Sequence, residues 1–160
     1  MVGRPVSLGV TASPHQHVVQ VAGGALRMRA DVLQGEVGRN GALQKLLALY
    51  HAFHLAQVSQ AVACNGLRTV QQRCCRWLLT TSDQVRSDEF PVTHELLAQM
   101  LGVRRATITD VLAPLQLRGL IRNGRGRIFL LNRGEMEAAC CECYHRVREE
   151  YARLFGRTDD

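Results

Sequence analysis

The sequence has no run of about 18 consecutive apolar residues, the length that a membrane-spanning helix requires. It also lacks, after the early basic residue Arg4, the apolar core of a secretory signal peptide. Hydrophobic residues make up 46% and charged residues 21% of the 160 residues. This composition is typical of soluble globular proteins and excludes the disordered and collagen-like classes. We therefore expect a soluble, cytoplasmic protein with no membrane partner.

Catalytic motifs are absent as well. The chain has no Walker loop and no GxSxG, HExxH or GxGxxG segment, so we do not expect an enzyme. Adjacent cysteines such as Cys74 and Cys75 rarely pair with each other, and free thiols fit a reducing compartment. A helical CCxC segment would place Cys140 and Cys143 on one face and Cys141 on another, which is a poor zinc site. We therefore expect no metal and no cofactor.

Lysine is nearly absent, since Lys45 is the only lysine among 20 basic residues. The positive charge is concentrated between Arg104 and Arg133, where seven arginines accompany a single acid, Asp110. This region accounts for the whole net charge of +6, because the remaining 13 basic and 13 acidic residues cancel. Such a concentration indicates a polyanionic partner; a solvated surface is the alternative.

The first 35 residues are rich in glycine and weakly patterned. Residues 18–21 predict a short strand and residues 25–33 a helical turn or two. A loop is expected at three glycines, Gly35, Gly38 and Gly41. This segment is too short to enclose a core of its own.

Residues 42–64 are predicted to form one long helix, because no glycine or proline interrupts them and Asn65 and Gly66 follow as stop residues. The apolar residues occupy more than one face, so the helix must be covered on more than one side. A second copy of the same helix would cover it; packing against its own chain is the alternative. The predicted dimerisation residues are Leu43, Leu46, Leu47, Tyr50, Phe53 and Val58.

Three further helices are indicated by their caps. Thr69 and Gln72 form a capping box that predicts a helix through residue 81. Thr93 can cap the next helix, Gly102 allows a sharp turn, and another helix begins near Arg104. Apolar residues recur at helical spacing in the last two: Leu96, Leu97, Met100 and Leu101, then Ile108, Val111, Leu112 and Leu115. A helix, a glycine turn and a helix with a basic N-terminal end are typical of a helix-turn-helix.

A basic hairpin is predicted next. Two apolar runs flank the segment RNGRGR at residues 122–127, and an Asn-Gly turn between such runs is a hairpin signal. Arg125 and Arg127 lie near its tip, where they would contact phosphate. A helix-turn-helix followed by this hairpin is a stronger signal of nucleic-acid binding than either alone.

These segments resemble the Crp/Fnr family of bacterial transcription regulators, from about residue 18 to residue 156. Three stretches carry the resemblance: LAQVSQAVACNGLRTVQQRCCRWLL (55–79), FPVTHELLAQMLGVRRATITDVL (90–112) and LQLRGLIRNGRGRIFLLN (115–132). They are similar to the family's dimerisation helix and the helix after it, its helix-turn-helix, and its wing. The tail 135–156 resembles a C-terminal helix of one subgroup. The resemblance implies a mainly α fold with a small β part.

The resemblance also implies roles for single residues. Arg105 would read a guanine, since two hydrogen bonds to one base give about 1–3 kcal/mol of discrimination, and Arg104 and Thr107 would hold phosphate. Ala106 replaces a glutamate common in the family, and Asp110 replaces a longer side chain, so the target sequence should differ. The predicted DNA-binding residues are Arg104, Arg105, Ala106, Thr107, Thr109, Asp110, Thr93, Arg125 and Arg127.

Family members begin with a cyclic-nucleotide-binding-type β-roll. Only about 35 residues precede the long helix here, so the resemblance implies a truncated sensor without a small-molecule effector. We expect a β-roll remnant at 1–37, a dimerisation helix at 38–66, and a winged helix-turn-helix domain with a C-terminal helix at 67–160. The expected function is binding of a two-fold symmetric operator as a homodimer, with double-stranded DNA and RNA polymerase as partners. The alternative is a non-specific nucleic-acid-binding or protein-interaction module left by truncation.

Overall fold

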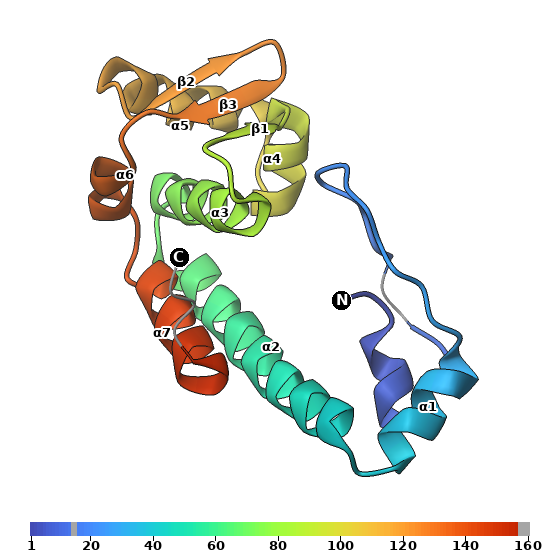
Figure 1. The fold of residues 1–160 in the computed structure, drawn as a ribbon. Coiled ribbons are helices and arrows are strands. Elements are labelled where there is room, and N and C mark those ends of the chain that lie inside the picture. Colours follow the sequence, from blue (N-terminus) through green and yellow to red (C-terminus); the bar gives the residue numbers. More distant parts are fainter. Residues whose placement is uncertain (14–15, 157–160) are drawn as a thin grey trace.

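A computed structural model describes residues 1–13 and 16–156 of the chain. It is mainly helical with one small antiparallel sheet, as predicted (Figure 1). None of the described helices is both long enough and apolar enough to cross a membrane. The described elements are η1 (Arg4–Leu8), α1 (Ala30–Gly38), α2 (Ala42–Leu67), α3 (Val70–Val85), β1 (Glu89–Pro91), α4 (His94–Leu101), α5 (Arg105–Leu117), β2 (Ile121–Gly124), β3 (Arg127–Leu130), α6 (Arg133–Ala139) and α7 (Cys143–Phe155).

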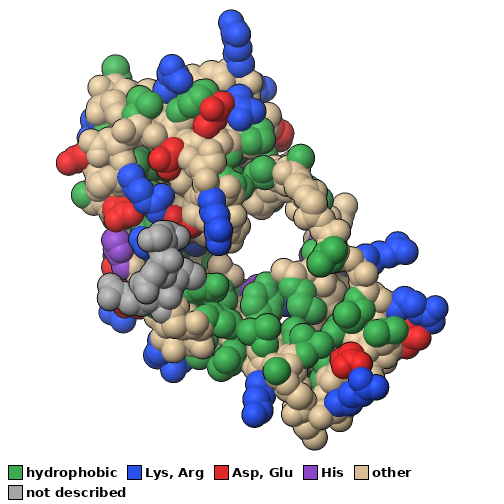
Figure 2. Space-filling view, in the orientation of Figure 1, with side chains coloured by type: hydrophobic (Ala, Val, Ile, Leu, Met, Phe, Trp, Pro, Cys, Tyr) green, Lys and Arg blue, Asp and Glu red, His purple; other side chains and the backbone are tan. Residues whose placement is uncertain are grey.

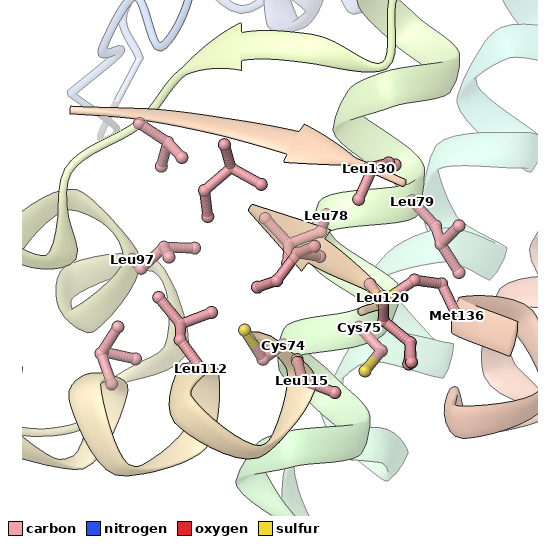
Figure 3. Close-up of a cluster of buried hydrophobic side chains, with 14 of the residues drawn as sticks. Cys74, Cys75, Leu78, Leu79, Leu97, Leu112, Leu115, Leu120, Leu130 and Met136 are labelled. Atoms are coloured by element: carbon pink, nitrogen blue, oxygen red, sulfur yellow. The ribbon is translucent and has the colours of Figure 1, made fainter. Parts of the chain in front are cut away.

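One hydrophobic core joins α3, α4, α5, α6 and the sheet. Figure 3 shows side chains from these elements converging, with Leu78 of α3 and Leu112 of α5 among them. Cys74 and Cys75 belong to this core and are fully buried. Burial raises the pKa of Cys74 to about 12 and the pKa of Cys75 to about 11, so both thiols stay protonated and serve as packing residues.

The sheet has the strand order β1-β3-β2. Strand β1 was not predicted from the sequence; its Phe90 is buried, opposite Ile128 of β3. A strand of three residues with one buried side chain gives no alternating pattern to detect. Pro91 is accommodated in β1 because that strand lies at the edge of the sheet.

The predicted hairpin is present, but its turn lies two residues later than expected. Asn123 and Gly124 end strand β2, and the two loop residues are Arg125 and Gly126. Their φ angles are +53° and +72°, the left-handed pair that a type I′ turn requires. The turn therefore forms at Arg125 and Gly126, and not at the Asn123-Gly124 pair that the sequence indicated.

The long helix α2 runs three residues further than predicted. Asn65 and Gly66 remain helical, and the chain leaves the helix only at Arg68, where φ is −114° and ψ is 149°. The capping box of Thr69 and Gln72 is confirmed and opens α3, which extends to Val85 rather than residue 81. Helix α2 therefore ends at the extended residue Arg68 and the cap of α3 that follows it, and not at the predicted stop residues Asn65 and Gly66.

The C-terminal tail forms two helices, α6 and α7, where one was expected. Helix α7 lies beside α2 (Figure 1). Phe53 of α2 packs edge-on against Tyr151 and Phe155 of α7, with ring centroids 5.4 and 6.1 Å apart. The chain's own C-terminal helix therefore covers one side of α2.

The predicted strand at residues 18–21 is wrong. Those residues form no strand, the chain bends at Gln20 and Val21, and Val18 and Val19 are exposed. A strand is stable only when a neighbour completes its backbone hydrogen bonds. The helix expected at 25–33 is α1, which begins at Ala30 and includes two of the three glycines assigned to a loop.

Candidate nucleic-acid interface

The helix-turn-helix is built by local interactions at α4 and α5. The Thr93 hydroxyl accepts a hydrogen bond from the Leu96 N–H at 3.1 Å and caps α4. Gly102 ends α4 with φ +65°, in the left-handed region that glycine adopts most readily. Arg104 is extended and immediately precedes α5. The turn thus presents the N-terminal end of α5, which carries the positive end of the helix dipole.

Helix α5 turns one face inward and one outward. Ile108, Leu112 and Leu115 are buried in the core, as the helical spacing predicted. In α4, Leu97 and Leu101 are buried, whereas Met100 is exposed and accepts a hydrogen bond from the Gln20 amide. The predicted recognition residues lie on the outer side of α5: Arg104, Arg105, Ala106, Thr109 and Asp110 are exposed and Thr107 is half-buried.

Ion pairs and one cation–π contact divide the arginines between residues 104 and 133 into two groups. Four have partners: Arg118 with Glu135 at 3.3 Å, Arg127 with Glu89 at 2.7 Å, Arg133 with Asp83 and Glu137, and Arg122 over the Phe129 ring at 4.2 Å. The other three, Arg104, Arg105 and Arg125, form no ion pair with any described residue. The arginines of this region that contact neither a carboxylate nor an aromatic ring among the described residues therefore lie at the start of α5 and at the hairpin tip.

A surface hollow brings part of the predicted site together. Thr93, Arg105 and Arg125 line the same hollow, although they come from the start of α4, the start of α5 and the hairpin. Thr109 and Asp110 are not among its lining residues and lie further along α5. Glu95 of α4 also lines the hollow. With Arg104 at the start of α5, the face formed by the hollow and the start of α5 carries three arginines and one carboxylate, and it is called the basic face below.

Two residues of this hollow, His94 and Asn123, were missed in the sequence. The Asn123 amide lies 2.6 Å from His94 Nε2, and His94 Nδ1 lies 3.2 Å from the Thr109 hydroxyl. With the amide donating to Nε2, the imidazole keeps its proton on Nδ1 and donates it to Thr109. The backbone N–H of Asn123 also donates to the Gln116 side chain at 3.1 Å. These bonds fix the hairpin relative to α4 and α5.

A third missed residue is Arg73 of α3, which is 8% exposed. Its guanidinium donates to the Leu101 carbonyl at the end of α4 at 2.7 Å, and to the carbonyl and side-chain oxygens of Asn65 in α2 at 3.4 Å. No sequence signal distinguishes this arginine from those on the surface, because its partners lie on other helices.

The predicted dimerisation residues fall into three groups. Leu47 is buried and Phe53 packs on α7, so both are covered by their own chain; Leu43 and Tyr50 are half-buried. Leu46 and Val58 are 53% and 44% exposed. Figure 2 shows hydrophobic side chains gathered on the surface over α2 and the N-terminal helices. The exposed large apolar residues within α2 are Leu46, Leu49, Leu55, Val58, Val62 and Leu67.

A helix-turn-helix with an exposed basic N-terminal end, followed by an arginine-tipped hairpin, defines the winged helix-turn-helix class. Residues 72–139, from α3 to α6, match the family model of the Crp-like helix-turn-helix domain. This part of the chain is therefore similar to the Crp-like helix-turn-helix domain.

A solved structure of a Crp/Fnr family protein shares the fold. A Crp/Fnr family transcriptional regulator from Eubacterium rectale is 25% identical over 69% of this chain and 51% of its own, with a TM-score of 0.53. A CRP family regulator from Thermus thermophilus is 22% identical over 72% of this chain and 55% of its own, with a TM-score of 0.46. The chain thus spans about half the length of these proteins. Among curated proteins, no sequence matches it.

Proposed function

We propose that the protein is a cytoplasmic transcription regulator that binds a two-fold symmetric DNA operator as a homodimer. The observation that carries this proposal is the basic face. Arg105 and Arg125, which form no ion pair with described residues, line one hollow between two elements of a winged helix-turn-helix. Arg104 adds a third such charge at the adjoining end of α5.

In this proposal the N-terminal end of α5 enters the major groove. Arg105 donates two hydrogen bonds to a guanine, while Arg104 and Thr107 hold the phosphates on either side of the groove. Ala106 offers only a methyl group, which suits contact with the methyl of thymine. Asp110 lies further along the exposed side of α5, where its carboxylate can accept a hydrogen bond from cytosine.

The hairpin acts as the wing and contacts the backbone through Arg125. Arg127 contributes less, because its guanidinium is held by Glu89. Thr93 lies beside Arg125 in the hollow, where its position at the N-terminus of α4 suits a phosphate. The Thr109 hydroxyl is engaged by His94, so its main role is to orient the hairpin.

Pairing of two chains is assigned to α2. Leu55, Val58 and Val62 follow one another at intervals of three and four residues, so they share one exposed apolar face. A second α2 packed on this face would place two recognition helices in successive major grooves, about 34 Å apart. In this organisation residues 38–66 pair the subunits, residues 67–160 bind DNA, and RNA polymerase is a partner of the DNA-bound dimer.

The test is selection of the purified protein on a random double-stranded DNA library at about 150 mM salt, near physiological ionic strength. Enrichment of a two-fold symmetric sequence is expected. Arg105→Ala should then relax the preference at one base pair per half-site, at a cost of about 1–3 kcal/mol on the best sequence. Retention without sequence preference would indicate a non-specific binder, and no retention would indicate a protein-interaction module; either result would overturn the proposal.

A further inference from the structure

Three cysteines that are distant in sequence meet at the junction of α2 and α7. Cys64 lies in the last turns of α2, Cys141 lies between α6 and α7, and Cys143 is the first residue of α7. They are 1%, 2% and 2% exposed. The sulfur atoms of Cys64 and Cys141 are 3.5 Å apart, and all three lie within 4.8 Å of one another.

The break between α6 and α7 creates this cluster. In a continuous helix, positions 141 and 143 would point about 200° apart, at about 100° per residue. Cys140 instead adopts an extended conformation, with φ −80° and ψ 167°, and the chain re-enters a helix at Cys143. Cys141 and Cys143 can then both face Cys64 on the neighbouring helix, an arrangement that the helical interpretation of CCxC excluded.

The ligand atoms of the cluster are all sulfur. Thiolates are soft ligands, which select soft metals such as Cu(I) and the borderline Zn²⁺ over Mg²⁺ and Ca²⁺. Cys140, half-buried, packs against the same cluster, but its sulfur donates to the Gln72 carbonyl at 3.9 Å and lies outside the group of three. We propose that Cys64, Cys141 and Cys143 bind a soft, thiophilic metal ion.

Two polar side chains act on the sulfur atoms of the cluster. Burial raises the pKa of the Cys64 thiol to about 12, and the positive charge of Arg76 acts in the opposite direction. The Arg76 Nε is buried and has no hydrogen-bond partner among the described residues. The Gln60 amide donates to the Cys143 sulfur at 3.0 Å. On binding, each thiol releases its proton to solvent and its sulfur lone pair bonds the metal.

A metal held here would join the end of α2 to α7 directly. The junction is otherwise closed by the Arg68–Glu142 ion pair at the surface and by the packing of Phe53 on α7. Since a ligand that binds only the folded state stabilises it, metal should raise the melting temperature of the protein. This inference does not depend on DNA binding.

The experiment titrates Cd²⁺ into the full chain, reduced with a phosphine and freed of metal. One Cd²⁺ per chain is expected, with thiolate-to-cadmium charge-transfer absorption in the ultraviolet and a rise in melting temperature that Mg²⁺ does not produce. Cys64→Ala, Cys141→Ala and Cys143→Ala should each weaken binding by at least about ten-fold. The matched control is Cys74→Ala, which removes a buried thiol from the separate core and should bind like the wild type.

The proposed metal site would be refuted if the three cluster variants bound Cd²⁺ with unchanged affinity. It would also be refuted if Cys74→Ala lost as much affinity for Cd²⁺ as they do. Should the variants fail to fold, X-ray absorption by the zinc-loaded wild type decides the question instead. Three or four sulfur neighbours at about 2.3 Å are expected. A coordination shell of nitrogen and oxygen alone would refute the proposal.

Discussion

The contribution of the wing to DNA binding can be measured through the salt dependence of affinity. Arg125 lies at the hairpin tip without an ion-pair partner among the described residues, whereas Arg127 donates to Glu89 at 2.7 Å. The proposal therefore assigns a phosphate contact to Arg125 and a weaker one to Arg127. Arg125→Asn removes the first charge and keeps the turn, because asparagine tolerates the φ of +53° found there.

The expected size follows from counterion release. Each phosphate contact contributes about 0.9 to the slope of log K against log salt. A homodimer loses two contacts in the Arg125→Asn variant, so the slope should become shallower by about 1.8. Between about 50 and 200 mM salt, the ratio of wild-type to variant affinity should then shrink about twelve-fold.

The assay is fluorescence anisotropy with a labelled duplex that carries the selected operator, repeated with an unrelated duplex. The control is the double variant Glu89→Gln/Arg127→Gln, which removes the ion pair without changing the net charge and should leave the slope close to that of the wild type. A slope unchanged by Arg125→Asn would remove the wing from the interface. If the double variant lowered the slope as much as Arg125→Asn does, ion pairing would not decide which arginines bind DNA.

Three further predictions concern packing, pairing and the hairpin. Leu112→Ala should lower the free energy of unfolding by about 2–5 kcal/mol in urea denaturation, since this core side chain is 1% exposed; a loss below about 1 kcal/mol would contradict the core assignment. Val58→Asp should give monomers in analytical ultracentrifugation with unchanged helix content by circular dichroism, and a persistent dimer would place the interface elsewhere. Asn123→Ala removes the bond to His94 and should cost about 0.5–1.5 kcal/mol of stability. It should also weaken operator binding in the anisotropy assay, and unchanged affinity would mean that the hairpin needs no such support.

The sequence predicted the helix-turn-helix because its determinants are local. The Thr93 cap, the Gly102 turn and the inward residues of α5 act within a few positions of one another. Caps, turns and helical periodicity are the signals that sequence carries best. The capping box of α3 was predicted for the same reason.

The features that were missed depend on distant contacts. Strand β1 exists because β3, almost 40 residues later, supplies its hydrogen bonds. His94 and Asn123 are 29 residues apart, and Cys64 and Cys141 are 77 apart. Nothing local to any of these residues specifies its partner, so only the packing of the whole chain brings each pair together.

Arg73 makes the connection between the long helix α2 and the helix-turn-helix rigid. Its guanidinium is shared between the end of α2 and the last carbonyl of α4. A rotation of α2 that left α4 in place would strip a buried charge of one acceptor, which costs about 1–3 kcal/mol or more. The helix that is proposed to pair the subunits and the helices that read DNA should therefore move as one body, so the angle between paired chains sets the spacing of the two recognition helices.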